Sequence, residues 1–422
     1  MMTRQATSTV TPRLRFREFR KTNVWTTTEL IQLSAFVNER VGVTECTPYT
    51  VTSGVGLMSQ QEKLGRTIAG NSLKNYVLLR RNDFAYNKSA TKAFTQGFIA
   101  RYMGDERAAV PNSIFTCFRV NEEAIDPTYL DNLFSSNLHG KWLKSRIAVG
   151  ARAHGSLNVS DDDLMALPVP LPDGSKSLEE QKKIADCLTS LDEVIVAQGR
   201  KVEALKAHKR GLMQQLFPRE GETRPRLRFP EFRNAGDWQR MPFGRAATFY
   251  NGRAYKQEEL LESGRYPVLR VGNFFTSTTW YHSGLELDET KYCENGDLLY
   301  AWSASFGPRI WRGEKSIYHY HIWKVIEQPG VDKKFLFITL ENETENMKAK
   351  TTNGLGIMHI TKGAIESWES SFPTIAEQRK IAGFLTSLDN TITAEIEMVD
   401  TFKIHKVGLM QQLFPSTDAI QS

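Results

Sequence analysis

The sequence has few cysteines, and they lie far apart. Cys46, Cys117, Cys187 and Cys293 include no pair at zinc-ligand spacing and no dense framework of the kind that secreted disulfide scaffolds have. We therefore expect reduced thiols. The N-terminal residues lack the apolar core of a signal peptide, and no apolar run reaches the roughly 20 residues that a membrane span needs. A cytoplasmic protein is expected.

Motifs of common catalytic centres are also missing. The one Gly-Lys pair, in Gly140–Trp142, is not followed by Ser or Thr, so it is no Walker loop. No Asn/Asp-Pro-Pro-Tyr/Phe motif of an amino-methyltransferase occurs. His319 and His321 share one strand face without an evident third ligand, which favours packing or surface roles over a metal site.

One pattern imitates a metal-dependent nuclease site. Asp173 is followed by Glu180 and Lys182 in the order of a PD…ExK motif. The equivalent copy at Glu377 keeps the glutamate but has neither the upstream aspartate nor the lysine. Because such a site needs converging carboxylates around a metal, we interpret the match as accidental. An enzyme that uses Asp173 and Glu180 is the weaker alternative, and we expect no catalytic centre, metal or cofactor in this chain.

The chain is long and mildly basic. Its 422 residues exceed one ordinary domain, and 40% hydrophobic with 24% charged residues is typical of globular proteins. The formal net charge of +6 favours a polyanionic partner such as nucleic acid, although many proteins with small substrates are as basic.

A long internal repeat organises the sequence. Residues 181–218 and 378–415 agree at 23 of 38 positions without a gap, and both end in GLMQQLFP. Upstream, PRLRFREF at 12–19 recurs as PRLRFPEF at 225–232. The order is therefore a variable block, a repeated block, a second variable block and the repeated block again.

Each repeated block reads as one long helix. Ser177 with Glu180 and Thr374 with Glu377 fit capping boxes, and each helix is expected to stop before Pro218 or Pro415. Apolar residues follow a heptad, with polar interruptions at the same two places in both copies. This seam comprises Ile184, Leu188, Leu191, Ile195, Gln198, Val202, Leu205, Lys209, Leu212, Leu216, and Ile381, Leu385, Leu388, Ile392, Glu395, Val399, Phe402, Lys406, Leu409, Leu413.

The equal seams predict that the two helices pack on each other, antiparallel, within the chain. The alternative is that each packs on its neighbouring domain or on another protein. At 1.5 Å per residue, the seam of one helix is roughly 50 Å long, or on the order of 14 base pairs of DNA.

The variable blocks share landmarks in the same order. These pairs are 82–86 with 296–300, 115–120 with 320–325, 126–130 with 332–336, and 155–160 with 356–361. We predict one α/β (α+β) fold used twice, with rewritten loops, in a pseudo-twofold internal repeat. The expected division is a first variable domain at 1–176, a central helix at 177–218, a second variable domain at 219–373, and a C-terminal helix with tail at 374–422.

The loops of both blocks carry residues suited to DNA. Arg, Lys and Asn contact base edges, whereas hydroxyls and amines hold phosphates. The predicted DNA-binding residues are Asn87, Lys88, Ser89, Lys92, Arg101, Arg152 and His154 in the first block, and Arg270, Asn273, Tyr281, Ser303, Ser305 and Arg309 in the second.

These features together resemble the specificity subunit of type I restriction–modification enzymes. The resemblance is carried by EQKKIADCLTSLD, EQRKIAGFLTSLD, the doubled GLMQQLFP, and GDLLYAWSASFG at 296–307. It implies that each variable block recognises one half of a split, asymmetric DNA target. It further implies that the paired helices act as a ruler and as a docking surface for two methyltransferase subunits, which flip and methylate an adenine.

The resemblance places the chemistry in partner chains. S-adenosylmethionine, ATP and Mg²⁺ are expected there, with restriction subunits adding translocation and cleavage, and no membrane partner is implied. The residues expected in the helix pair or at a subunit contact are Ile184, Leu188, Leu191, Ile195, Leu212, Leu216, Phe217, Ile381, Leu385, Leu388, Ile392, Leu409, Leu413 and Phe414. The alternative function is a free-standing bipartite DNA-binding regulator without catalytic partners.

Overall fold

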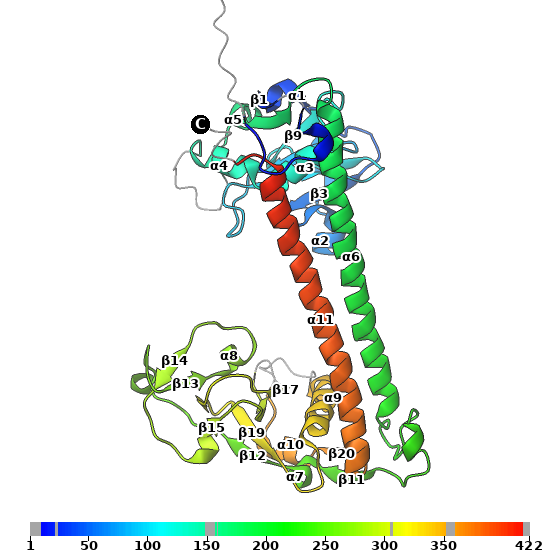
Figure 1. Ribbon diagram of the computed structural model, residues 1–422, viewed down its shortest axis with the longest axis vertical. Coiled ribbons are helices and arrows are strands. Elements are labelled where there is room, and N and C mark those ends of the chain that lie inside the picture. Colours follow the sequence, from blue (N-terminus) through cyan, green and yellow to red (C-terminus); the bar gives the residue numbers. More distant parts are fainter. Residues whose placement is uncertain are drawn as a thin grey trace, which may run out of the picture. The chain divides into compact units, whose positions relative to one another are not determined.

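The computed structural model describes residues 10–21, 24–147, 157, 159–303, 307–351 and 359–416 (Figure 1). The chain forms two compact units. The first contains residues 1–199 and 397–422, and the second contains residues 200–396. Each unit therefore consists of one variable block, the start of one long helix and the end of the other.

Three sheets form in the described part of the first unit. Strands β1 (Trp25–Glu29) and β10 (Pro168–Pro172) pair antiparallel. An antiparallel sheet has the order β2 (Ser34–Phe36), β9 (Phe115–Val120), β6 (Asp83–Asn87), β7 (Phe98–Arg101). A second sheet has the order β4 (Gly56–Ser59), β3 (Thr47–Thr52), β8 (Ala108–Val110), β5 (Val77–Leu79), in which β3 and β8 run parallel.

The second unit repeats this topology strand for strand. Strands β11 (Gln239–Pro242) and β20 (Glu369–Phe372) pair antiparallel. The first four-stranded sheet has the order β12 (Ala247–Asn251), β19 (Ile322–Glu327), β16 (Leu298–Ala301), β17 (Gly307–Ile310). The other has the order β14 (Tyr281–Ser283), β13 (Tyr266–Leu269), β18 (Ser316–Tyr318), β15 (Tyr292–Cys293), with β13 and β18 parallel. The prediction of one fold used twice is confirmed.

Short helices connect these strands. In the first unit they are α1 (Leu30–Leu33), α2 (Gln60–Leu64), α3 (Pro127–Ser135), α4 (Leu138–Lys144) and α5 (Asp161–Met165), with 3-10 turns η1 (Arg17–Phe19) and η2 (Gly70–Asn75). In the second they are α7 (Phe243–Ala246), α8 (Val271–Phe275), α9 (Lys333–Thr351) and α10 (Lys362–Ser367), with η3 (Pro230–Phe232), η4 (Gln257–Glu259) and η5 (Glu289–Lys291).

The predicted helix starts in the two blocks are confirmed. The Asp126 carboxylate accepts the backbone N–H of Tyr129 at 2.9 Å, and the Asp332 carboxylate accepts that of Phe335 at 3.1 Å. These side chains satisfy free N–H groups of the first turn of α3 and α9.

The repeated blocks form the long helices α6 (Ser177–Leu216) and α11 (Ile375–Leu413), which end before Pro218 and Pro415 as predicted. All twenty predicted seam residues are buried or half-buried. The seam is therefore a packed surface in both helices, as the heptad requires.

Interhelical ion pairs show that α6 and α11 run antiparallel. In the first unit Lys406 Nζ lies 2.6 Å from Asp192. In the second unit Lys209 Nζ lies 2.7 Å from Asp389, and Lys201 Nζ lies 2.6 Å from Glu395. Residue numbers rise along one helix as they fall along the other. The lysines that interrupt the seam therefore pair with the aspartates of the repeated LTSLD segments.

The ends of the two helices are anchored in domain cores. In the first unit, Leu413 at the end of α11 and the following Phe414 pack with Ile184 and Leu188 of α6. The centre of the Phe414 ring lies 5.6 Å from that of Tyr129.

The second unit uses the other copies in the same way. Leu216 and Phe217 pack with Ile381 and Leu385, and the Phe217 ring stacks on Phe335 at 5.5 Å. Because two alike cores each receive a helix end, both ends have the same sequence. The predicted docking residues at these ends are core residues of the domains.

The predicted capping role of Glu180 and Glu377 is wrong. Helix α6 begins at Ser177 itself, so this serine is no N-cap residue. The Glu180 carboxylate is 1% exposed and receives Arg15 through two hydrogen bonds of 2.6 and 2.7 Å. Glu377, also 1% exposed, receives Arg228 through two bonds of 2.7 Å. A buried guanidinium binds such a carboxylate more strongly than a backbone N–H does.

The neighbouring glutamines complete this arrangement. Gln181 accepts the backbone N–H of Asp126 at 2.9 Å, and Gln378 accepts that of Asp332 at 2.8 Å. We call each Arg–Glu pair, Arg15–Glu180 and Arg228–Glu377, a clamp. Each clamp joins a PRLRF segment to a long helix, while the adjacent glutamine joins the same helix to α3 or α9.

Candidate nucleic-acid interface

The repeated frame makes equivalent loops identifiable. The connection from β6 to β7 spans residues 88–97 in the first domain, and the connection from β16 to β17 spans 302–306 in the second. The predicted residues Lys88, Ser89 and Lys92 fall in the former, and Ser303 falls in the latter. Residues chosen separately from the sequence therefore occupy corresponding loops of a shared frame, which is where recognition usually resides.

Another loop differs strongly between the domains. Strands β3 and β4 are joined by the short turn 53–55, whereas β13 and β14 are joined by residues 270–280, which include α8. Predicted residues Arg270 and Asn273 lie in this longer connection, and Tyr281 opens β14. The second domain has thus gained a recognition-sized loop at a position where the first has a tight turn.

Predicted residues of the first domain differ in their availability. Lys92 is exposed. The Lys88 ammonium lies 2.8 Å from Asp161, which also accepts the Thr116 hydroxyl at 2.6 Å. These bonds lower the Asp161 pKa against the opposing effect of burial, which is the largest influence on it. Lys88 is thus held at the start of α5.

Two further predicted residues have local roles. Asn87 is buried, and its side-chain oxygen accepts the backbone N–H of Ser89 at 3.0 Å, which shapes the loop start. The side chain of Arg101 is only 10% exposed; it donates to Thr128 at 2.8 Å and lies 3.4 Å from Asp131. Arg101 therefore joins β7 to α3 and faces the protein interior.

In the second domain the structure brings several predicted residues close to aromatic rings. The exposed Arg270 guanidinium lies 5.3 Å from the centre of the Tyr281 ring. The exposed Arg309 guanidinium lies 5.0 Å from the Phe275 ring. Asn273 donates to the Thr279 carbonyl at 2.7 Å and so closes its own loop. Arg270 and Arg309 are thus cations supported by rings at the surface.

The predicted residues Arg152, His154 and Ser305 lie outside the described residues. Ser303 is half-buried and pairs through its backbone with His359.

Some basic residues are internal supports of the frame. Arg119 makes two hydrogen bonds of 2.6 and 2.7 Å to Asp83, which is fully buried, and the bond to Asp83 raises the Arg119 pKa. In the second unit, Lys324 of β19 lies 2.8 Å from Asp297, one residue before β16, in a register that differs from that of Arg119 by two residues. Both pairs join the corresponding strands β6–β9 and β16–β19. Their positive charges are neutralised within the protein.

Sequence reasoning assigned no DNA contact to an aromatic cluster between β18 and β19. Tyr320 is 39% exposed, and its ring lies 3.9 Å from His321. The His321 ring lies 4.8 Å from Trp302, whose indole N–H donates to the Tyr320 carbonyl at 2.7 Å. The signal in the sequence is the run His319–His321, for which the sequence favours packing or surface roles over a metal site.

Titration leaves these imidazoles uncharged. Burial lowers the His319 pKa to about 4, with smaller contributions from His321 and Arg270, and burial also lowers the His321 pKa. At neutral pH each ring therefore has one donor and one acceptor nitrogen.

The described residues contain no cluster suited to a metal ion, and two buried thiols are held in their neutral form. Among the described residues, no group of three or more His, Cys, Asp or Glu side chains could hold a metal ion. Burial raises the pKa of the Cys117 thiol, and that of Cys293 to about 12, so both are poor nucleophiles at neutral pH. Glu180, the carboxylate of the nuclease-like pattern, is occupied by Arg15.

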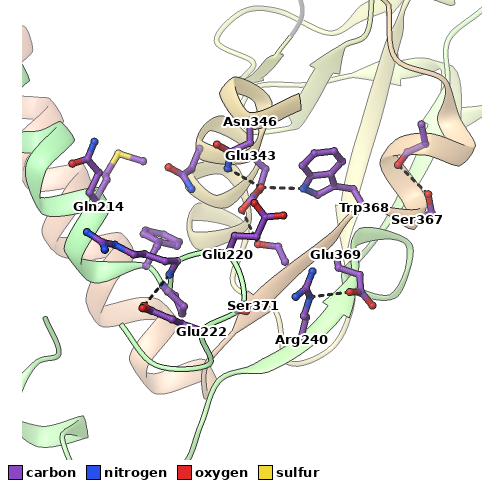
Figure 2. A pocket seen from close by; sticks show the side chains of 18 residues that line it. Gln214, Glu220, Glu222, Arg240, Glu343, Asn346, Ser367, Trp368, Glu369 and Ser371 are labelled. Carbon is purple, nitrogen blue, oxygen red and sulfur yellow. Dashed lines mark hydrogen bonds and ion pairs between the residues drawn. The ribbon is translucent and has the colours of Figure 1, made fainter. Parts of the chain in front are cut away.

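A cavity of about 930 Å³ in the second unit also differs from a phosphate site (Figure 2). It lies among the end of α6, α9, α10 and β20 and contains Glu220, Glu222, Glu343 and Glu369 against only two arginines. Glu343 accepts the Trp368 indole N–H at 3.0 Å, and Glu369 pairs with Arg240 (Figure 2). The excess of carboxylates would repel DNA.

The helices of the described chain include none with the length and apolar character of a membrane span.

Comparisons with known proteins agree with this architecture. The family model of the type I restriction modification DNA specificity domain matches residues 236–398. The type I restriction enzyme MjaVIII specificity subunit of Methanocaldococcus jannaschii is 28% identical over 197 residues, which cover 44% of this chain and 43% of that protein. The putative MjaX specificity subunit of the same organism is 25% identical over 328 residues, covering 74% and 72%.

Solved structures show the same fold. A chain from a structure titled as the basis of complex assembly and conformational transition of the type I R-M system has a TM-score of 0.59 at 16% identity, covering 93% of this chain and 98% of that one. The type I S subunit from M. genitalium has a TM-score of 0.50 at 14% identity, covering 96% and 99%. In sequence the chain is thus similar to the specificity subunits of type I restriction–modification systems, and it shares its fold with solved chains of such systems.

Proposed function

We propose that this chain reads a bipartite, asymmetric DNA sequence for a type I restriction–modification complex. Each domain recognises one half of the target, and α6 with α11 connects the two readers. The observation that carries this proposal is the strand-for-strand repeat of one frame whose connecting loops differ in length and chemistry. Two unlike readers on one frame fit a target with two unlike halves.

The surface chemistry supports DNA as the ligand. The formal net charge is +6, Lys92 and Arg270 are exposed in the variable connections, and Arg309 is exposed on β17. Such cations suit phosphates, while neutral polar side chains beside them suit base edges.

We further propose that the chemistry belongs to partner chains. Two methyltransferase subunits would flip and methylate an adenine with S-adenosylmethionine, and restriction subunits would use ATP and Mg²⁺. The chain itself would bind none of these cofactors and act as a non-catalytic subunit. Its long helices would offer these partners their exposed faces, since the seam and the helix ends are engaged in packing.

Affinity purification tests the assembly. The full chain, purified from its native cells, should bring down a protein that contains an Asn/Asp-Pro-Pro-Tyr/Phe methyltransferase motif. In the same strains, methylated adenines should occupy a split DNA sequence and disappear when this chain is deleted. Recovery of specific DNA binding without any methyltransferase would instead identify a free-standing regulator.

A domain exchange tests the independence of the two readers. Replacing residues 219–373 with the corresponding block of another specificity subunit should change one half of the methylated target and preserve the other. The flanking helix residues stay in place, so the new block meets the same Phe217 and Ile381 core contacts. A change in both halves would contradict independent reading.

A further inference from the structure

A backbone ladder holds the start of the β6–β7 loop in the first domain. The Lys88 N–H donates to the Ile114 carbonyl at 3.3 Å, and the Leu157 N–H donates to the Lys88 carbonyl at 2.7 Å. Residue 88 is therefore fixed between the loop that precedes β9 and the segment that precedes α5. Ile114 is 44% exposed at this place.

The second domain forms the same ladder with other side chains. The Trp302 N–H donates to the His321 carbonyl at 3.0 Å, and the Ile360 N–H donates to the Trp302 carbonyl at 3.0 Å. Trp302 thus corresponds to Lys88, and His321 corresponds to Ile114. The frame is kept, but an ammonium and an aliphatic side chain are replaced by an indole and an imidazole.

The clamp positions of the same two domains, by contrast, do not change residue type between the copies. The clamps Arg15–Glu180 and Arg228–Glu377 are the same residue types in both copies. The clamp residues are kept between the copies, whereas positions 88/302 and 114/321 carry different side chains on an equivalent backbone ladder. Such a contrast is expected where the side chains select different ligands.

The rings in the second domain are supported from the core. Tyr300 stacks near-parallel on Trp323 at 5.9 Å, and Trp323 stacks on Trp302 at 5.9 Å, both with 20° between the ring planes. Tyr300 is fully buried, and the row ends at the surface beside Tyr320 and His321. The surface rings are therefore preorganised, which reduces the entropic cost of binding through them.

The chemistry of this surface fits bases better than phosphates. Burial lowers the His321 pKa, which favours the neutral imidazole, and the Trp302 indole N–H is already engaged by the Tyr320 carbonyl. Phosphate contacts favour cations, whereas base edges are also read by neutral donors, acceptors and apolar groups. Arg270, which helps to lower the His319 pKa, supplies a cation nearby.

We propose that Trp302, Tyr320 and His321 form the base-reading surface of the second domain, while Arg270 contacts the phosphate backbone. The proposal rests on the function proposed above and assigns one half of the target to named side chains. Trp302 orients the Tyr320 backbone, and Tyr320 and His321 contact base edges.

Selection from a randomised DNA library tests this assignment. The full-length chain and its Tyr320→Ala, Tyr320→Phe and His321→Asn variants are each bound to duplexes randomised at both halves, and the bound DNA is sequenced. We expect the Ala and Asn variants to lose about tenfold of their preference at one or two positions of the second half. The first half and the slope of log affinity against log salt should stay unchanged.

Arg270→Ala is the matched contrast. It should weaken binding to all sequences alike and reduce the salt slope by about 1, because a phosphate contact is lost. Tyr320→Phe keeps the ring at an exposed site, so folding is retained and only the hydroxyl contribution is removed.

The outcomes separate this proposal from the function on which it rests. A wild-type chain that selects no sequence would overturn both. The wild-type chain could instead select a split sequence while the Tyr320→Ala and His321→Asn variants keep the wild-type preference in the second half. That result would overturn this assignment alone.

Discussion

At the scale of single residues, the repeated polar positions form internal contacts that could not be assigned from the sequence. The doubled Glu-Gln dipeptide suggested helix capping, because its serine or threonine partner is three residues away. Its actual partners, Arg15 and Arg228, are 165 and 149 residues distant in sequence. Both motifs are visibly repeated, but the pairing of each arginine with its glutamate becomes visible only in the folded domain.

Removal of one clamp carboxylate should strongly destabilise the second unit. Glu377→Ala leaves the Arg228 guanidinium, 9% exposed, without its bidentate partner, and we expect a loss of about 3 kcal/mol in the free energy of unfolding. Urea denaturation measures it. Asp237→Ala removes the exposed partner of Arg224 and should change stability little. Equal effects of the two substitutions would contradict a special role for the buried clamp.

His139 should make the first unit sensitive to acid. Burial lowers its folded-state pKa to about 4, against a smaller opposing effect of the Gly97 carbonyl. The unfolded pKa is about 6.5, so below that pH the unfolded state binds a proton that the folded state excludes. Stability should therefore be complete above pH 6.5 and fall by about 1.4 kcal/mol per pH unit towards pH 4.

His139→Gln should flatten this part of the pH profile, measured as the urea midpoint of wild type and variant at several pH values. A variant whose profile between pH 6.5 and 4 parallels that of wild type would show that other groups cause the acid sensitivity.

At the scale of elements, the long helices were predictable, but one shared landmark was displaced: 115–120 form β9, and the counterpart β19 spans 322–327, two residues beyond the predicted 320–325. The DNA-binding roles of the loop residues stay predictions. Heptad spacing and terminal prolines are local signals, and they placed α6 and α11 correctly. Arg101 appeared suited to DNA because exposure cannot be read from residue type; in the structure it joins β7 to Asp131. Trp302 and His321 were not predicted as recognition residues because their equivalence to Lys88 and Ile114 depends on the backbone ladder.

The interhelical ion pair Lys406–Asp192 should contribute measurably to helix pairing. Lys406 is 18% exposed and Asp192 about half exposed, so solvent screens the pair in part. We expect a coupling energy of about 1 kcal/mol from a double-mutant cycle of Asp192→Asn and Lys406→Met in urea unfolding. The pair Asp400–Lys403, which lies within one helix, is the control and should give a smaller coupling. If the stability effects of the two substitutions were strictly additive, the Asp192–Lys406 pair would not help to set the register of the two helices.

At the scale of the whole molecule, the antiparallel pairing changes how a ruler experiment has to be designed. Lengthening α6 alone moves Asp192 by a full heptad relative to Lys201, so their partners Lys406 and Glu395 can no longer both be reached. Varying the first helix by itself therefore disturbs pairing as well as length. A matched insertion in α11 keeps each pair in register.

We expect one heptad inserted within 193–200, together with one heptad within 396–405, to lengthen the gap between the two target halves and to leave their sequences unchanged. Seven residues add about 10 Å of helix, which corresponds to about 3 base pairs of DNA. Mapping methylated adenines measures the gap. The single insertion in α6 is the control and should lower the urea midpoint, because ion pairs are broken. If the matched insertion folded normally and the gap kept its length, the helices could not be the ruler, and the spacing would have to be set by the methyltransferase subunits or by the DNA itself.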